Sequence, residues 1–483
     1  MAGCGDGQGG VEPGPAGGPT YYADAKAIVD ARCATCHRPG DIGPFPLTTF
    51  AEVKAFAGPV RAAVESGTMP PWQPSDECNS YQENIDLTAA EKELLLAWLK
   101  ADAPEGNLDE APASTPPASL GFEADLSLQL PEPYTPTREP DDYRCQLIPW
   151  PAEDTRFVTG LRVMPDQRAI VHHVIVFVVG PEAAEQYRGF DAAEEGPGYT
   201  CYGGPRANTG GGLGNVDPAV LFAALNELGL TVADVQSGNL TEEQFLALAA
   251  KVRGDEAVGL FRSIGSWVPG APAGRLPAGT GIRVEPGSLL VAQFHYNTLT
   301  SAPVADQSRI EIATAPSVER EATILPAVDL GWVSQGLIRE PMTIPAGAAN
   351  VQHSTTLAYD SVFVAGARRT LNLSEDAPLV IHRANHHMHE LGTSQRTELR
   401  HADGTKSCVL DIPDWDFHWQ GSYTLAEPVT IRPGDSLWMG CTWDNTAANQ
   451  PIIDGQARTP ANVAWGEGTS DEMCLGAFYV TAE

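Results

Sequence analysis

Residues 169–179 read AIVHHVIVFVV, a run of β-branched and aromatic side chains around two histidines. This composition over a short run predicts a strand. Similar short runs, some alternating with period two, are separated by turn residues over the last two thirds of the chain. They are TRFVTGLRV (155–163), SLLVAQFHYN (288–297), SRIEIATA (308–315), TTLAY (355–359), SVFVAGARRTLNL (361–373), SCVLDI (407–412), EPVTIRPGDSLWMGCTW (427–443) and CLGAFYV (474–480). We therefore expect an all-β region with enough strands for two sandwiches.

Two helical stretches interrupt the β pattern. DPAVLFAALNELGL and TEEQFLALAAKVRG, at about 217–254, lie between predicted strands and read as an insertion. It serves either as a packing element or as a lid over a site.

Length and charge bound the remaining possibilities. A chain of 483 residues predicts two or three domains. The net charge of −32 argues against nucleic acid or an anionic membrane as the partner. No stretch approaches the roughly 18 consecutive apolar residues of a membrane span.

The motif CATCH, Cys33–His37, has the C-x-x-C-H spacing that attaches haem c, with His37 as an axial ligand of the iron. A zinc half-site or a redox dithiol is the competing interpretation, but no second pair of zinc ligands follows nearby. Met69, in SGTMPPW, lies on a proline-stiffened loop and suits the sixth ligand position. An amphipathic helix with a capping box at Thr88 and Glu91 comes next. Residues 21–105 thus resemble a small class I cytochrome c, which is all-α.

Two segments are predicted to be linkers. Residues 1–20 are rich in glycine and proline, and AGC resembles the end of a bacterial lipoprotein signal, which makes Cys4 a candidate lipid anchor of the precursor. The alternative is a chance cysteine in a disordered tail. Residues 106–120 are acidic and rich in proline and alanine, and form the second linker.

IHRANHHMHELG, residues 381–392, holds four of the eleven histidines. The preceding run APLVI predicts a strand, in which His387 and His389 would project to one face and His386 to the other. Two further groups are His172 with His173, and His295 at the end of a predicted strand. A lone histidine is more often a core residue than a ligand, but three groups together favour a metal, and imidazole with a thioether favours copper.

The ordered motifs VHHVIVF, VAQFHYN, HMHELG, PGDSLWMGCTWDN and SDEMC resemble those of the copper type II, ascorbate-dependent monooxygenases, over about residues 125–483. The resemblance implies two β-sandwich domains, here 121–315 and 316–483, each holding one copper ion across an open, solvent-filled cleft. It implies that one copper transfers electrons and that the other activates O2. The implied ligand sets are His172, His173 and His295 for the first copper, and His387, His389 and Met473 for the second. Because neighbouring residues of a strand diverge, His172 and His173 can share one copper only at a twist or a bulge.

The resemblance also implies disulfides and a reaction. Cys441 would pair with Cys474 and Cys145 with Cys201, whereas Cys78 and Cys408 have no implied partner. The reaction would be hydroxylation of an sp³ C–H bond with O2, on a small-molecule or peptide-like substrate, with electrons from an external donor entering through the haem domain. The alternative is a non-enzymatic copper-binding or electron-transfer protein.

Three positions depart from the peptide-amidating members of that family. Asn385 stands where they have an arginine that anchors the substrate carboxylate, and Leu475 and Ala477 replace polar and tyrosyl groups. Peptide amidation is therefore not expected. Haem attachment and disulfides both require an oxidising compartment, so we expect an extracytoplasmic protein, as a periplasmic or outer-surface lipoprotein would be.

Overall fold

The computed structural model describes residues 18–39, 43–82, 84–111, 123–201, 204–205, 218–253, 262–268, 274–299, 301–334, 336–417, 419–453, 456–466, 468 and 470–483. The chain divides into two compact units. Unit 1 comprises Met1–Trp72 and Asn84–Leu120, and unit 2 comprises Gln73–Glu83 and Gly121–Glu483. Within the described residues, no helix has the length and apolar character needed to cross a membrane.

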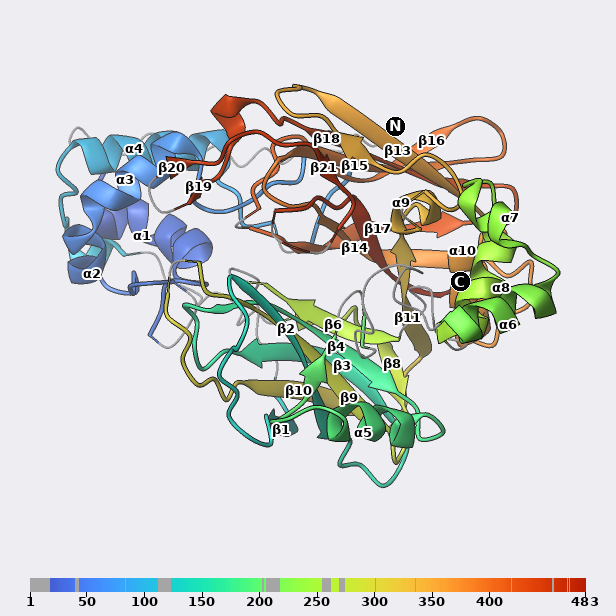
Figure 1. The fold of residues 1–483 in the computed structure, drawn as a ribbon. Helices are drawn as coiled ribbons and strands as arrows, with labels where there is room; N and C mark the ends of the chain where they lie inside the picture. Colours follow the sequence, from blue (N-terminus) through green and yellow to red (C-terminus); the bar gives the residue numbers. More distant parts are fainter. Residues whose placement is uncertain are drawn as a thin grey trace, which may run out of the picture. The chain divides into compact units, whose positions relative to one another are not determined.

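Unit 1 is helical around an aromatic and aliphatic core (Figure 1). Its helices are η1 (Tyr21–Ala25), α1 (Lys26–Ile28), η2 (Val29–Cys33), α2 (Phe50–Ala55), α3 (Ala57–Ser66), α4 (Ala89–Lys100) and η3 (Leu108–Glu110). The predicted capping box of α4 is present, because Thr88 accepts from the Glu91 backbone and Glu91 from the Thr88 backbone. Leu95, Trp98 and Leu99 bury the apolar side of α4 in the core.

Unit 2 is built from β-sheets (Figure 1). Its strands are β1 (Leu126–Gln129), β2 (Asp141–Pro149), β3 (Arg156–Met164), β4 (Val171–Val179), β5 (Tyr199–Thr200), β6 (Ser263–Trp267), β7 (Gly274–Arg275), β8 (Thr280–Val284), β9 (Leu289–Asn297), β10 (Arg309–Ala315), β11 (Arg320–Ala327), β12 (Thr343–Ile344), β13 (Val351–Ala358), β14 (Leu379–His387), β15 (Gly392–Arg400), β16 (Lys406–Ile412), β17 (Ser422–Ile431), β18 (Ser436–Trp443), β19 (Ile452–Ile453), β20 (Gln456–Ala457), β21 (Val463–Ala464) and β22 (Leu475–Ala482). The helices are α5 (Ala184–Ala192), α6 (Pro218–Leu228), α7 (Val232–Gln236), α8 (Glu242–Arg253), α9 (Leu330–Val333), α10 (Val362–Thr370) and η5 (Ala447–Asn449).

Three sheets carry the site. A five-stranded sheet has the order β5-β2-β9-β4-β6, and a four-stranded sheet has the order β13-β18-β15-β16. A nine-stranded sheet runs β1-β10-β3-β8-β11-β22-β14-β17, with β7 also paired to β3. One apolar core joins side chains of the five-stranded sheet to those of β3, β8 and β10. Because β11 pairs with β8 on one side and β22 on the other, one continuous sheet serves both halves of unit 2.

One predicted strand is a helix. SVFVAGARRTLNL reads as β-branched, but residues Val362–Thr370 form α10. The buried residues Phe363, Val364, Ala367 and Arg368 recur with the spacing of a helical face, so a single apolar side suffices to pack the segment. The predicted insertion at 217–254 contains three helices, α6, α7 and α8, rather than two.

Three disulfides lie in unit 2. Cys145 bonds to Cys201 and Cys441 bonds to Cys474, the two pairings that the resemblance implied. The third joins Cys78 to Cys408, across 330 residues of sequence. The segment 73–82 thereby attaches to β16, and the Gln82 backbone also donates to Thr424 of β17 at 2.9 Å.

Candidate metal centre

The first histidine set comprises His172, His173 and His295, on neighbouring antiparallel strands of the five-stranded sheet. His173 on β4 faces His295 on β9, and the register of the pair shifts between Val171 and His173. The bulge required for two consecutive histidines to serve one site is therefore present at His172.

Three Nδ1 atoms of this set lie close together. His173 Nδ1 is 3.4 Å from His172 Nδ1 and 3.3 Å from His295 Nδ1. Ligand atoms of all three residues lie within 4.8 Å of one another, a spacing that could hold a metal ion. An imidazole-bound ion such as zinc lies about 2.0–2.1 Å from each nitrogen, which sets two nitrogens about 3.3–3.6 Å apart at tetrahedral to trigonal angles. The residues fit a metal with imidazole ligands, such as copper.

Residues of β2 and β9 orient His295. Its Nε2 donates to Asp141 Oδ1 at 2.8 Å, and Asn297 Nδ2 donates to the same oxygen at 2.9 Å. The Tyr143 ring stacks on the His295 ring with centroids 4.1 Å apart and planes 7° apart. With its proton on Nε2, His295 directs the Nδ1 lone pair toward the other two histidines.

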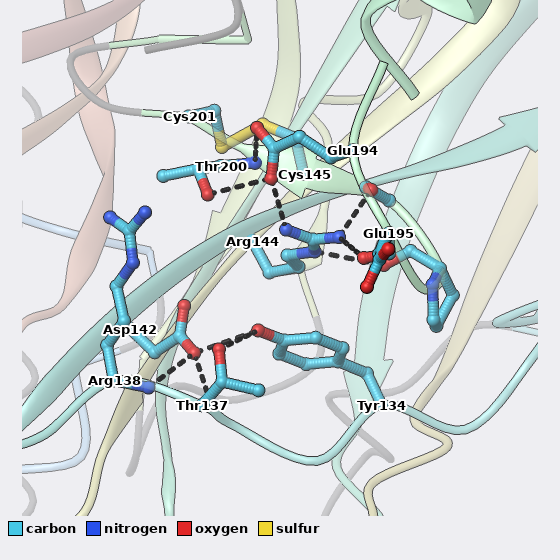
Figure 2. Close-up of polar contacts among 12 residues, drawn as sticks. Tyr134, Thr137, Arg138, Asp142, Arg144, Cys145, Glu194, Glu195, Thr200 and Cys201 are labelled. Carbon is cyan, nitrogen blue, oxygen red and sulfur yellow. Dashed lines mark hydrogen bonds and ion pairs between the residues drawn. A yellow bond between two sulfur atoms is a disulfide. The ribbon is translucent and has the colours of Figure 1, made fainter. Parts of the chain in front are cut away.

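The opposite face of β2 is anchored by a polar network, as Figure 2 shows. The buried Arg144 pairs with Glu194 at 2.6 Å, and Glu194 also accepts from the Thr200 backbone. The buried Asp142 accepts from Tyr134 Oη at 2.8 Å. Because side chains alternate along a strand, fixing Arg144 and Asp142 on one face also fixes Asp141 and Tyr143 on the other.

The second histidine set comprises His387 and His389. Their ring centroids lie 5.1 Å apart. The expectation that both stand on one strand is wrong, because β14 ends at His387. His387 Nδ1 donates to Gln420 Oε1 at 2.6 Å, and His389 Nδ1 donates to the Asp471 carbonyl at 3.0 Å. In these tautomers both Nε2 atoms keep their lone pairs for a metal.

Glu472, beside Met473, explains the position of His389. This fully buried carboxylate accepts from the backbone of His389 at 3.0 Å, from the backbone of Leu391 at 2.7 Å and from Trp443 Nε1 at 2.8 Å. Sheet pairing of β14 stops after His387, and the hydrogen bonds to Glu472 then hold the backbone of His389 and Leu391 in place. The same segment carries Met473 and continues into the disulfide-bonded Cys474.

The two sets contact one another. The ring centroids of His173 and His387 are 6.5 Å apart. Phe417 touches both sets, with centroids 5.1 Å from His172 and 6.0 Å from His389. The resemblance implied an open cleft between two metal sites, whereas here their side chains are neighbours. The continuous sheet through β11 is the physical link between the two halves.

Burial favours the neutral form of His173, His387 and His389. It lowers the pKa of His389 to about 3, and lowers the pKa of His387. Burial, followed by the neighbouring His295 and His172, holds the pKa of His173 well below its usual value. Neutral imidazole is the form that binds a metal.

In unit 1, Cys33 and Cys36 form no disulfide, and they lie one helical turn apart. His37 Nδ1 donates to the Phe45 carbonyl at 3.0 Å, which leaves Nε2 for an iron atom. Met69 follows α3 and is 40% exposed. The thiols and the imidazole have the chemistry that haem c attachment needs.

The residues without a predicted metal-ligand role include His353, His382, His386, His418 and Cys4. His382 Nε2 is 2.8 Å from Thr481 Oγ1, and His386 Nε2 is 2.9 Å from Thr397 Oγ1. His353 Nε2 donates to the Thr343 carbonyl at 2.9 Å. Each of these three histidines therefore has a hydrogen-bond partner within the protein. His418 and Cys4 lie outside the described residues.

Part of unit 2 is similar to a known protein family. Residues 342–481 match the C-terminal domain of the copper type II ascorbate-dependent monooxygenases. The matched segment contains His387, His389 and Met473, and the family that it resembles uses copper for hydroxylation. The match supports an oxidoreductase of the monooxygenase class. A search of curated proteins found no match.

Two solved structures illustrate a weak similarity to this chain. PNGF-II matches with 10% identity and a TM-score of 0.26, covering 74% of this chain and 65% of that chain. The VP2 subviral particle of infectious bursal disease virus matches with 11% identity and a TM-score of 0.15, covering 77% and 74%. The chain thus spans about two thirds of PNGF-II.

Sequence reasoning missed the residues that orient the imidazoles. Asp141, Gln420 and Glu472 come from three separate segments of the chain. Only Glu472 had a signal, because it lies inside the SDEMC motif. Asp141 and Gln420 are recognisable only once β2 and the segment before β17 are placed.

Proposed function

We propose that the protein is a copper-dependent monooxygenase that hydroxylates an sp³ C–H bond with O2. The observation that carries the proposal is the convergence of five imidazoles in two adjacent sets, one of them inside the segment 342–481 that matches the copper-monooxygenase family. Copper bound there would supply single electrons and an open position for O2. His172, His173 and His295 would hold one ion through Nδ1, and His387 and His389, with the Met473 thioether, would hold the other.

The remaining polar residues act on the ligands. Asp141 and Gln420 fix the tautomers of His295 and His387, which keeps the metal-facing nitrogens deprotonated. Glu472 holds the backbone of His389 beside Met473. The soft thioether of Met473 would favour Cu(I) over Cu(II) at this site.

We also propose that residues 21–105 form a haem c domain that passes electrons to the copper ions from an external donor. The two neighbouring thiols of Cys33 and Cys36 support this role, as does the imidazole of His37, which the Phe45 carbonyl orients. Met69 is the proposed sixth ligand. Three disulfides in unit 2 support an extracytoplasmic location, and a lipid anchor on Cys4 is part of that proposal.

The surroundings of the second set bear on the substrate. Asn385, at the position of the carboxylate-anchoring arginine, donates its side-chain amide to the Gly421 carbonyl at 2.8 Å. It offers no cation to a peptide carboxylate. Leu475, the partner of His387 across β14 and β22, is apolar. These features favour a substrate other than a peptide C-terminus.

Copper stoichiometry tests the proposal. The protein purified anaerobically should bind two copper ions per chain, and His172→Ala with His173→Ala should remove one of them. His382→Ala, a buried histidine bonded to Thr481, is the matched control and should leave two. Loss of both ions in the double variant, or binding of zinc in preference to copper, would contradict the two-site proposal.

A further inference from the structure

One loop contacts imidazoles of both histidine sets. We call it the bridging loop; its described residues are Trp415–Phe417 and Trp419–Gln420. Trp415 Nε1 donates to the His389 carbonyl at 3.2 Å. Gln420 accepts from His387 Nδ1, and its own Nε2 donates to the Phe417 carbonyl at 2.9 Å. The backbone of Phe417 is therefore fixed by the same amide that orients His387.

The Phe417 ring lies against one imidazole of each set. It stacks on His172 with planes 27° apart, and it meets His389 nearly edge-on at 75°. Both centroid distances, 5.1 and 6.0 Å, fall within the 4.5–7 Å range of favourable aromatic pairs. His172 belongs to the first set and His389 to the second, so one side chain constrains a ring in each.

The bridging loop is itself held by the segment 73–82. Gln73 Nε2 donates to the Asp416 carbonyl at 3.2 Å. The Ser75 backbone donates to the Asp411 carbonyl at 2.8 Å, just before the loop. The Cys78–Cys408 disulfide makes this attachment covalent. A loop held at both its backbone and its side chains can position the ring that it carries.

The rotation of an imidazole about its side-chain bonds decides where its nitrogen lone pair points. A flat ring packed against the imidazole restricts that rotation, and a flexible aliphatic side chain does so less well. We propose that Phe417 is a positioning residue that sets the orientation of His172 and His389 together and so couples the two metal sites. This inference rests on the proposed function, in which both sets hold copper.

The first test needs no metal. In histidine-labelled, metal-free protein, Phe417→Leu removes the aromatic ring current and should shift the imidazole carbon-bound proton resonances of both His172 and His389. The resonances of His353 and His382 should stay in place. Phe190→Leu, which removes a ring packed on Tyr187 and Tyr199, is the matched control and should move neither.

The second test uses the copper-loaded protein. Phe417→Leu should keep two copper ions but alter the electron paramagnetic resonance signals of both Cu(II) sites, and Phe417→Tyr, which keeps the ring, should restore them. A ring that only fills space would lower thermal stability and leave both signals unchanged, which would overturn the inference. A shift of only one imidazole in the metal-free protein would also overturn it. Failure of the wild type to bind copper would instead refute the proposed function, and the metal-free resonances would still decide the inference.

Discussion

At the scale of single residues, the site depends on which nitrogen of each imidazole carries the proton. His295 is protonated on Nε2 by its bond to Asp141, whereas His387 is protonated on Nδ1 by its bond to Gln420. The two sets consequently present different nitrogens to a metal. The candidate ligand residues were proposed from motif order, but these tautomers depend on partners that are distant in sequence.

Asp141→Asn tests the first of these tautomers. The amide can still bond to His295, but it loses the charge that favours an Nε2–H donor. We expect copper affinity at the first set to fall about 10- to 100-fold, as is typical when the hydrogen-bond partner of a ligand is replaced. Competition with a Cu(I) chelator measures this copper affinity. Asp142→Asn, which acts on Asp141 only through the β2 backbone, should lower stability and reduce copper affinity less than Asp141→Asn does, and equal affinity losses in both variants would contradict the account.

Met473→His tests the role of the thioether. A harder imidazole ligand still binds copper, so occupancy should persist while hydroxylation falls steeply. Carbon monoxide bound to Cu(I) reports the change through the C–O stretch. The stretch should shift in Met473→His and not in His172→Ala. The reverse pattern would exchange the roles of the two sites.

At the scale of elements, the β-branched runs located strands such as β3, β4 and β9 but missed others, among them β2, β11 and β15. Tertiary contacts explain the one run that was assigned to the wrong type of element. SVFVAGARRTLNL has strand-like composition, yet one buried face makes it helix α10. The bulge at His172 could be anticipated because two consecutive ligands demand one. The end of β14 before His389 could not be anticipated, because it depends on the carboxylate of Glu472, which lies 83 residues further along the chain.

The Cys78–Cys408 disulfide should hold the segment 73–82 on β16 and β17. Replacing both cysteines by serine should lower the free energy of unfolding by about 2–4 kcal/mol. Amide exchange should rise at Ser75 and Gln82, whose backbones donate to Asp411 and Thr424. Hydrogen-exchange mass spectrometry measures the rate of this amide exchange. The pair Cys145→Ser and Cys201→Ser is the control, and an equal rise at Ser75 and Gln82 there would contradict a local attachment.

His386, on β14 between the sheets, predicts a pH dependence. Its side chain is fully buried, and burial lowers its pKa to about 3, whereas an unfolded histidine titrates near about 6.5. As pH falls through this window the unfolded state takes up a proton first, so stability decreases by up to about 1.4 kcal/mol per pH unit for this group. His386→Gln can keep a bond to Thr397 without titrating. Urea unfolding of the metal-free variant should therefore show a shallower decline of the free energy of unfolding between about pH 6 and 4, a window that lies between the two pKa values. An unchanged slope would refute the assignment.

At the scale of the whole molecule, the chain alternates between its two units. It passes from unit 1 to unit 2 at Trp72–Gln73, and returns at Asn84 before entering unit 2 again at Gly121. An all-α region followed by β-sheets could be read from the periodicity. The passage of Gln73–Glu83 through unit 2 could not be predicted, because no local pattern reveals that Cys78 pairs with Cys408.

The central claim is that the two adjacent histidine sets form a copper centre that uses O2 with electrons from the haem domain. Oxygen uptake by the copper-loaded protein, with its haem reduced and the external reductant removed, tests this claim directly. We predict that O2 is consumed as the haem is oxidised, and that Met473→His, at equal copper content, slows the uptake steeply. Haem that stays reduced in the presence of O2, or uptake equal in both proteins, would contradict the claim.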